Sequence, residues 1–391
     1  MSRALEQRTF LLICLFCILA RLALVAMTYG SNDMDFVANW AALANHVGIS
    51  RAYLYTRMVN HPPASLALMS WIMRLSEASG ISFPDLFRTF QVLADALTAA
   101  ALYRIGGQKL ALFVLLSPGA AFVSAFHGNT DATMTALLVL AIALAIADRP
   151  ALAGTALALA AGIKIIPFLA APLFLAFFER RARILFLVAF AIATAILFGP
   201  AIAIGGPVVI RNIFGYAGGL PWEWGFTGVA FAISRKIPTM RAAGDAAIAF
   251  YSAWGRYFVY AGIAAVFVLV FAKRNRETLA LPHAIEIMLM TILALAPGFG
   301  VQYIGWLIPL LPFAFGWRAA IALNAAMSAF LFITYTVWSG GWPWWFADLA
   351  RPGPYRYVAA LAGCAMWMIL CVALVVAVRR FTRTTTPETA S

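Results

Sequence analysis

The chain has 391 residues, of which 64% are hydrophobic and only 11% are charged, with a formal net charge of +13. This composition excludes an ordinary soluble globular protein and predicts an integral membrane protein. The positive charge does not indicate a nucleic-acid partner, because the basic residues cluster where apolar runs end, which is the positive-inside pattern of a polytopic membrane protein.

Apolar segments follow one another along the whole chain and predict an all-α helix bundle in a single transmembrane domain, residues 1–391. Hydropathy predicts about twelve spans, at residues 11–29, 86–103, 110–125, 132–147, 151–163, 165–178, 184–202, 246–271, 285–296, 303–315, 319–337 and 357–378. The basic clusters YRIGGQK, FFERRAR, AKRNRE and RRFTR all fall on one side if the N-terminus is cytoplasmic. We therefore expect a plasma (inner) membrane protein with both termini in the cytoplasm and a cytoplasmic tail at 380–391.

The first span contains Arg21, which either snorkels to the interface or pairs with an acidic residue in the bundle. The more specific hypothesis is a pair with one of the outer carboxylates. Residues 30–83 then form the first extracytoplasmic loop. Its segments 35–47 and 62–75 are too short or too polar to span, so they are predicted to be juxtamembrane helices along the outer interface. The short spans 151–163 and 165–178 are expected to meet near Lys164 at the outer face.

The stretch SNDMDF places Asp33 and Asp35 at the exit of the first span. One interpretation is a solvated pair at the start of the next helix, where carboxylates are favourable. The other is a general base, with the neighbouring carboxylate tuning its pKa or holding a metal.

Further polar residues are predicted on the same outer side. VNHPPAS contains His61, FHGNTD contains His127, Asn129 and Asp131, and Arg211 and Gln302 follow later. Either histidine alone is equally well explained as a hydrogen-bonded loop residue. Lys164 either snorkels or supplies a point charge for a phosphate. The aromatic tract 340–357 is best explained as an interfacial belt, and less well as a surface that stacks on a sugar.

Several of these motifs, in this order, resemble the GT-C superfamily of polytopic glycosyltransferases, which use polyprenyl-phosphate sugars. NDMDFVANW, with Asp33, Asp35 and Trp40, resembles the acidic pair and tryptophan of the dolichyl-phosphate-glucose-dependent glucosyltransferases. NHPP resembles their acidic-aromatic-Pro-Pro motif, although Asn60 and His61 replace the usual residues.

Three later segments are similar to the first mannosyltransferase of GPI-anchor assembly. They are HGNTD with Asn129 and Asp131, KIIP with Lys164, and VQYIGW, whose residues are Gln302, Tyr303 and Trp306. The shared order covers roughly two-thirds of the chain.

The resemblance implies an extracytoplasmic active site in which Asp33 is the base and Asp35 assists. It implies phosphate binding by Lys164 and, less directly, by His127, His61 or Arg211. Substrate contacts are implied for the other motif residues, Trp40, Asn129, Asp131, Gln302, Tyr303 and Trp306. The implied reaction transfers a hexose, either mannose or glucose, from a polyprenyl-phosphate donor to a lipid-linked or glycan acceptor. This transfer would invert the anomeric centre.

No Walker loop or dinucleotide fingerprint is present, and we expect no cofactor, with a divalent cation as the open alternative. Expected partners are the donor, the acceptor and membrane lipids, without nucleic acid. The alternative function is a secondary transporter or lipid-sugar flippase, but such folds commonly show internal repeats, and we find none. An O-antigen polymerase or ligase would be expected to have a large basic outer loop, which is missing.

Overall fold

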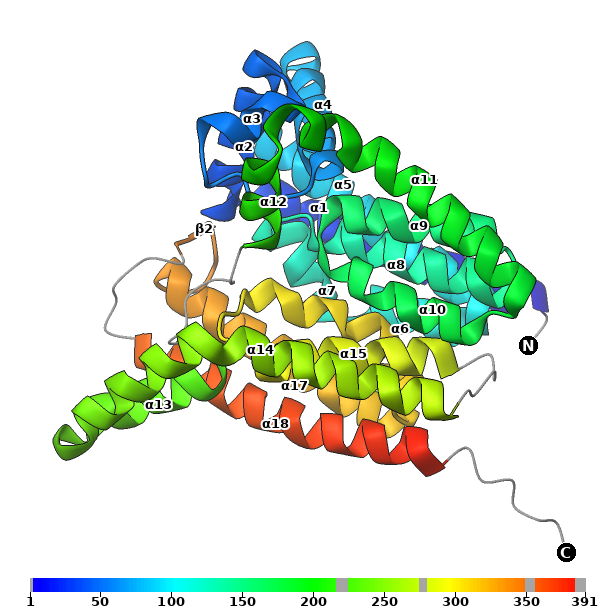
Figure 1. Cartoon of the computed structure of the whole chain (residues 1–391). Helices are drawn as coiled ribbons and strands as arrows, with labels where there is room; N and C mark the ends of the chain where they lie inside the picture. Colours follow the sequence, from blue (N-terminus) through cyan, green and yellow to red (C-terminus); the bar gives the residue numbers. More distant parts are fainter. Residues whose placement is uncertain (1–2, 216–223, 274–279, 349–355, 384–391) are drawn as a thin grey trace, which may run out of the picture.

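The computed structural model describes residues 3–215, 224–273, 280–348 and 356–383, and these form an all-α bundle, as predicted. The first and last described residues, Arg3 and Arg383, lie at one end of the bundle, on the right of Figure 1, and a group of short helices lies towards the other end. Residues 384–391 of the expected tail, part of the basic cluster AKRNRE and part of the aromatic tract lie outside the described residues.

The elements follow the chain in a simple order. The first half contains α1 (Arg3–Met27), β1 (Gly30–Ser31), α2 (Asp33–Val47), α3 (Ile49–Tyr55), α4 (Pro63–Ser79), α5 (Phe83–Gly106), α6 (Gln108–Leu115), α7 (Pro118–Ala121), the π-helical turn η1 (Phe122–His127), α8 (Asp131–Ile146), α9 (Pro150–Ile163), the 3₁₀ turn η2 (Ile166–Ala170) and α10 (Ala171–Phe177). The second half contains α11 (Arg180–Gly205), α12 (Pro207–Phe214), α13 (Gly225–Lys236), the 3₁₀ turn η3 (Pro238–Met240), α14 (Arg241–Lys273), α15 (Ala280–Leu295), the 3₁₀ turns η4 (Val301–Trp306) and η5 (Ile308–Leu310), α16 (Leu311–Ala314), α17 (Trp317–Ser339), β2 (Phe346–Ala347) and α18 (Arg356–Arg383).

Every predicted span falls on helical chain, but the count of about twelve crossings is not confirmed. Within the described chain, five helical segments are long and apolar enough to cross a membrane: α1, α11, α14 with η3, α17 and α18. A sixth results if α6 and the α7–η1 segment, bent by 56° relative to each other, count as one span. The remaining predicted spans correspond to α5, which carries several charges, and to five shorter apolar segments. The protein is therefore a multi-pass membrane protein of mixed long and short helices.

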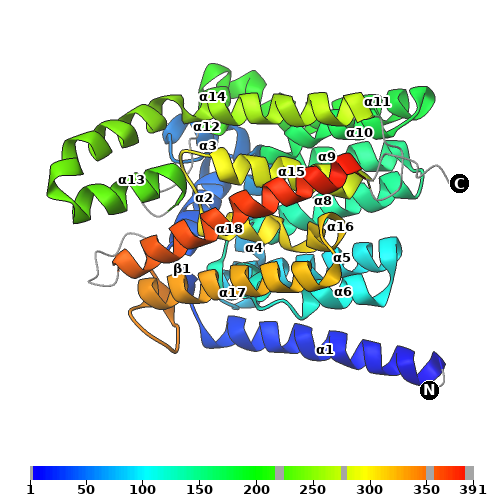
Figure 2. The same cartoon turned by 90° about the horizontal axis from the view of Figure 1, so that it is seen from below.

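The two segments predicted to be juxtamembrane helices are helical, as α2 and α4, and their place along the membrane interface stays a prediction. A third short helix, α3, lies between them and was not predicted. Pro62 and Pro63 start α4, because proline fits the first turn of a helix, where no backbone hydrogen bond is lost. Buried side chains of α2 and α4, among them Met34, Val37 and Leu66, pack with Phe87 of α5 in a hydrophobic cluster of their own. This cluster packs α2 against α4 and α5. Figure 2 shows the same bundle seen from below.

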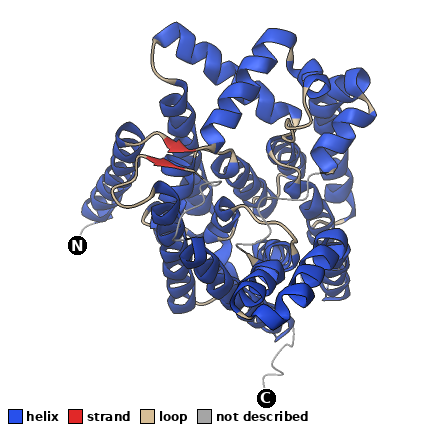
Figure 3. Cartoon of the chain, turned by 90° about the vertical axis from the view of Figure 1, so that its left-hand side faces the viewer, coloured by secondary structure: helices blue, strands red, loops and turns tan. Residues whose placement is uncertain are grey.

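The aromatic tract has a structural role that the belt interpretation did not include. Its residues Phe346 and Ala347 form a parallel two-residue ladder with Gly30 and Ser31, drawn as the red strands of Figure 3. The amide of Asn32 also donates to the carbonyl oxygen of Ala347, at 2.9 Å. The chain is thus fixed in place immediately before α2 begins.

Arg21 pairs with an acidic residue inside the bundle, which confirms one of the two alternatives, but its partner is not one of the outer carboxylates. Its Nε donates to Oδ2 of Asp95 in α5 at 3.0 Å, and its other nitrogens bond to backbone carbonyls, including that of Leu115 at 2.6 Å. The guanidinium is buried, and burial of a charge is tolerated where it is paired and hydrogen-bonded. The pairing links α1 to α5 inside the bundle.

Candidate active site

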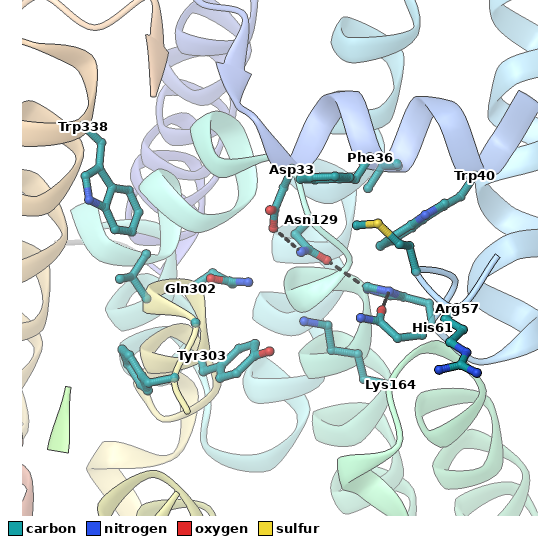
Figure 4. A pocket seen from close by; sticks show the side chains of 16 residues that line it. Asp33, Phe36, Trp40, Arg57, His61, Asn129, Lys164, Gln302, Tyr303 and Trp338 are labelled. Carbon is teal, nitrogen blue, oxygen red and sulfur yellow. Dashed lines mark hydrogen bonds between the residues drawn. The ribbon is translucent and has the colours of Figure 1, made fainter. Parts of the chain in front are cut away.

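A pocket with a volume of about 380 Å³ opens between α2, the α3–α4 connection and the η4 turn (Figure 4). Seven of the residues singled out in the sequence line it: Asp33, Trp40, His61, Asn129, Lys164, Gln302 and Tyr303. These residues come from parts of the chain up to 270 positions apart. The pocket is apolar over much of its wall, with a few polar groups facing each other, which is the usual form of a small-molecule site.

Asp33 is the first residue of α2 and lies in the helix turn where a carboxylate is favoured by the exposed backbone N–H groups. Both aspartates lie in the first turn of α2, as the first interpretation expected, but neither caps the helix, because the N-cap residue is Asn32. Side chains at positions i and i+2 of a helix point in different directions. Asp33 therefore does not share the orientation of Asp35: Asp33 lines the pocket, whereas Asp35 is exposed and accepts a hydrogen bond from the Tyr29 hydroxyl at 2.6 Å.

The carboxylate of Asp33 is held by two side chains. Asn129 Nδ2 donates to Asp33 Oδ2 at 2.6 Å, and His127 Nε2 lies 3.1 Å from the same oxygen. Burial raises the pKa of Asp33, but the hydrogen bond and charge of His127, the Asn129 amide and the charge of Lys164 outweigh it and hold that pKa below the usual value. Asp33 is therefore ionised at neutral pH. Among the described residues none bonds to its second oxygen, Oδ1.

The HGN turn supplies both partners of Asp33. The π-helical turn η1 ends at His127, and Gly128 follows with φ +80°, a conformation that side chains rarely adopt. A Cβ at Gly128 would also collide with the side chain of Met34 in α2. Glycine thus lets the turn approach α2 closely enough for His127 and Asn129 to reach one carboxylate.

His61 lies next to Asn129 in the pocket wall. Its Nε2 is 3.3 Å from Asn129 Oδ1, its Nδ1 is 2.8 Å from Asn60 Oδ1, and its ring packs 5.0 Å from that of Trp40. Burial and the nearby Lys164 charge lower the pKa of His61 to about 4. The ring is neutral at neutral pH, so only one of its two nitrogens carries a proton to donate to these amide oxygens, and the ring contributes no charge.

Lys164 follows the last residue of α9, where the backbone becomes extended. Its Nζ donates to Oδ1 of Asp131 at 2.7 Å, and the indole nitrogen of Trp306 donates to the same oxygen at 2.6 Å. The ammonium also lies 4.8 Å from the centre of the Tyr303 ring, within cation–π range. Lys164 does not snorkel to the surface, since only 10% of its side chain is exposed.

Not every candidate reaches the pocket. His127, Asp131 and Trp306 are buried behind it and contact the lining residues Asp33 and Lys164. Arg211, on α12, is exposed and is absent from the lining, as is Asp35. Binding of phosphate by Arg211 remains a prediction.

The pocket also contains residues that sequence reasoning missed, above all Arg57 and Trp338. Trp338 belongs to α17 and faces the pocket opposite Trp40 (Figure 4). Arg57 lies between α3 and His61. The sequence did contain a signal for Arg57. The positive-inside rule predicts few cations in an outer loop, so an arginine in the predicted outer loop is unexpected there.

The described part of the chain brings together no group of three or more His, Cys, Asp or Glu side chains able to hold a metal ion. Asp33 and Asp35 point in different directions, so they do not form a chelating pair. The arrangement instead offers an ionised carboxylate bonded to the amide of Asn129, the neutral imidazole of His61 next to that amide, and cations further along the same pocket. It is suited to removing a proton from a hydroxyl while an anionic group is held nearby.

Comparison with known protein families gives one match. The family model of glycosyltransferase family 87 matches residues 59–297, more than half of the chain, and this stretch includes His61, Asn129 and Lys164. A comparison with curated proteins found no match.

Proposed function

Since the chain belongs to glycosyltransferase family 87 and is a GT-C-type membrane glycosyltransferase, we propose that it moves a hexose from a polyprenyl-phosphate donor to a lipid-linked or glycan acceptor. Membership of this family favours an enzyme over the transporter or flippase that was the alternative function in the sequence analysis. Mannose and glucose are the sugars we propose, on the extracytoplasmic side of the membrane.

One observation carries the mechanistic part of this proposal. The ionised carboxylate of Asp33 lines the pocket, bonded through Oδ2 to Asn129 and His127 and without a described partner on Oδ1. A general base must be oriented and must have a free oxygen within reach of the proton that it accepts. The two bonds on Oδ2 supply the orientation, and Oδ1 supplies the accepting atom.

The reaction then follows as a direct displacement. The acceptor hydroxyl gives its proton to Asp33 as its oxygen forms a bond to the anomeric carbon, and the bond from that carbon to the donor phosphate breaks. The leaving group is the polyprenyl phosphate, whose growing negative charge is stabilised by a nearby cation. Attack opposite the leaving group inverts the anomeric centre. No nucleotide is required, because the donor is already activated.

The remaining pocket residues support binding of a sugar. Trp40, Tyr303 and Trp338 provide aromatic surfaces, and Gln302 provides an amide. Lys164 is proposed to act near the phosphate, but its bond to Asp131 neutralises much of its charge. Asp131 and Trp306 are proposed to position Lys164 rather than to touch the substrate.

A donor screen tests the proposal. The purified protein, in nanodiscs with a membrane-lipid extract as acceptor source, is incubated with polyprenyl-phosphate mannose, glucose, galactose or arabinose, each labelled in the sugar. We expect one donor to give a labelled glycosylated product together with free polyprenyl phosphate. Transfer from a nucleotide sugar only would contradict the proposed donor class. Flux of a labelled lipid-sugar across proteoliposomes, without any product, would contradict the proposed reaction.

A further inference from the structure

The pocket contains a cation that neither the sequence motifs nor the mechanism above uses. Arg57 lines the pocket, its side chain is exposed, and none of the described residues forms an ion pair or hydrogen bond with its guanidinium. Arginine is positively charged at every physiological pH and presents several donors in a planar fork that matches a phosphate. Such a group at a pocket mouth is a candidate anion site.

The other basic side chains of the pocket are less able to bind an anion. Lys164 is paired with buried Asp131 at 2.7 Å, so the two charges largely cancel. His61 is neutral, because its pKa is lowered to about 4. Arg57 is thus the lining cation that no described carboxylate neutralises.

The position of Arg57 relative to Asp33 suits an in-line displacement. Asp33, Asn129 and His61 are joined by two hydrogen bonds in series, of 2.6 and 3.3 Å, and Arg57 lies beyond His61 in Figure 4. A base and the cation that receives the leaving group must lie on opposite sides of the anomeric carbon. Asn129 and His61 fill the intervening wall, where the sugar would lie.

The surface around Arg57 indicates what carries the anion. Its neighbours Leu54, Tyr55 and Met58 expose 50%, 66% and 54% of their areas. The amide of Asn212 in α12 donates to the carbonyl oxygens of Tyr53 and Thr56, which ties α12 to this part of the chain. α12 itself exposes the apolar side chains of Ile210 and Phe214. Exposed apolar side chains beside a cationic pocket mouth fit an amphiphile rather than a free anion.

We infer that Arg57 binds the phosphate of the polyprenyl-phosphate donor, with the apolar face of α3 and α12 contacting the beginning of the polyprenyl chain. This inference rests on the proposed function, because it concerns the donor of that reaction. It assigns the main phosphate contact to a residue outside the motifs, and it leaves Lys164 as a secondary contact held by Asp131.

Binding of undecaprenyl phosphate to the purified full chain, measured in detergent by competition with a fluorescent polyprenyl phosphate, tests the inference. Undecaprenol and inorganic phosphate serve as the uncharged and the chain-free ligands. We expect the wild type to bind undecaprenyl phosphate more tightly than either. Arg57→Ala should weaken that binding roughly 10- to 100-fold, the usual range for loss of a charged hydrogen bond, and leave undecaprenol binding unchanged. Arg57→Lys should recover part of the loss.

Arg51→Ala is the matched control, because Arg51 is an exposed arginine of α3 that does not line the pocket. Equal affinity of Arg57→Ala and wild type for undecaprenyl phosphate would overturn the inference and leave the proposed function intact. The same weakening in Arg51→Ala would also overturn it, since the effect would then be one of general charge. A wild type that does not distinguish undecaprenyl phosphate from undecaprenol would contradict the donor class itself.

Discussion

At the scale of single residues, the site depends on which of several similar side chains faces the pocket. The spacing of Asp33 and Asp35 does not separate their roles, and only the resemblance assigned the base to Asp33, because their orientations depend on where α2 begins. That start is set by the ladder between residues 30–31 and 346–347, which are more than 300 positions apart. Tertiary contacts also decide two other roles. Arg57 was missed because its significance depends on the absence of a described partner, and Asp131, expected to contact the substrate, bonds to Lys164 instead.

His61 leads to a prediction about pH and stability. Its pKa is about 4 in the folded protein and 6.5 in an unfolded chain, so between these values the unfolded state binds one proton more. Stability is therefore fully present above about pH 6.5 and falls as the pH is lowered through this range, by about 1.4 kcal/mol per pH unit from this one group.

Thermal unfolding of the wild type and His61→Gln, measured in the same detergent between about pH 7 and about pH 4, tests this sign. We expect the wild type to lose more stability on acidification than the variant does, because glutamine does not titrate. An identical pH dependence for both proteins would show that His61 does not remain neutral in the folded state.

At the scale of elements, long apolar runs were predicted well and short elements were not. α1, α11, α17 and α18 carry an apolar pattern over many turns, which tertiary contacts do not override. α3 and α12 have seven and eight residues, and their exposed and buried faces are defined only by packing. The segment predicted as one span at 110–125 is instead α6 followed by the bent α7–η1, because Pro118 starts a new turn there.

The close packing of α9 and α11 leads to a second prediction. A Cβ at Gly154 would collide with the backbone oxygen of Phe186 and would lie 3.1 Å from the amide nitrogen of Phe190. Gly154→Ala must push the two helices apart, and we expect it to lower the stability by about 1–3 kcal/mol. The measurement is thermal unfolding in detergent.

Gly199→Ala is the matched control, because a Cβ at Gly199, also in a helix, would meet nothing within 4 Å. We expect it to unfold at the wild-type temperature or slightly above. Equal behaviour of the two variants would mean that α9 and α11 are not in backbone contact at Gly154.

At the scale of the whole molecule, the arrangement of charges leads to a prediction of sidedness. α1 begins and α18 ends at one end of the bundle, and the α4–α5 connection belongs to the α2–α4 group at the other end (Figure 1). The positive-inside rule assigns the terminal end to the cytoplasm. Cysteine substituted for exposed Ile81, between α4 and α5, should then react with a membrane-impermeant maleimide in intact cells.

Cysteine substituted for Glu179, which is exposed between α10 and α11, should react only after the cells are made permeable. Both variants are made in a chain whose four native cysteines are replaced by alanine. The reverse pattern of labelling would place the pocket on the cytoplasmic side and would contradict the proposed site of reaction.

The central claim is that Asp33 is the base of a hexosyl transfer, and the most direct test compares initial transfer rates of Asp33→Asn and Asp35→Asn at saturating donor. We predict that Asp33→Asn loses transfer roughly 100- to 10,000-fold, the usual contribution of a general base, while it unfolds at the wild-type temperature. Asp35→Asn should keep nearly the wild-type rate, because Asp35 faces Tyr29 outside the pocket. A folded Asp33→Asn variant with the wild-type rate, or equal losses in both variants, would contradict the assignment.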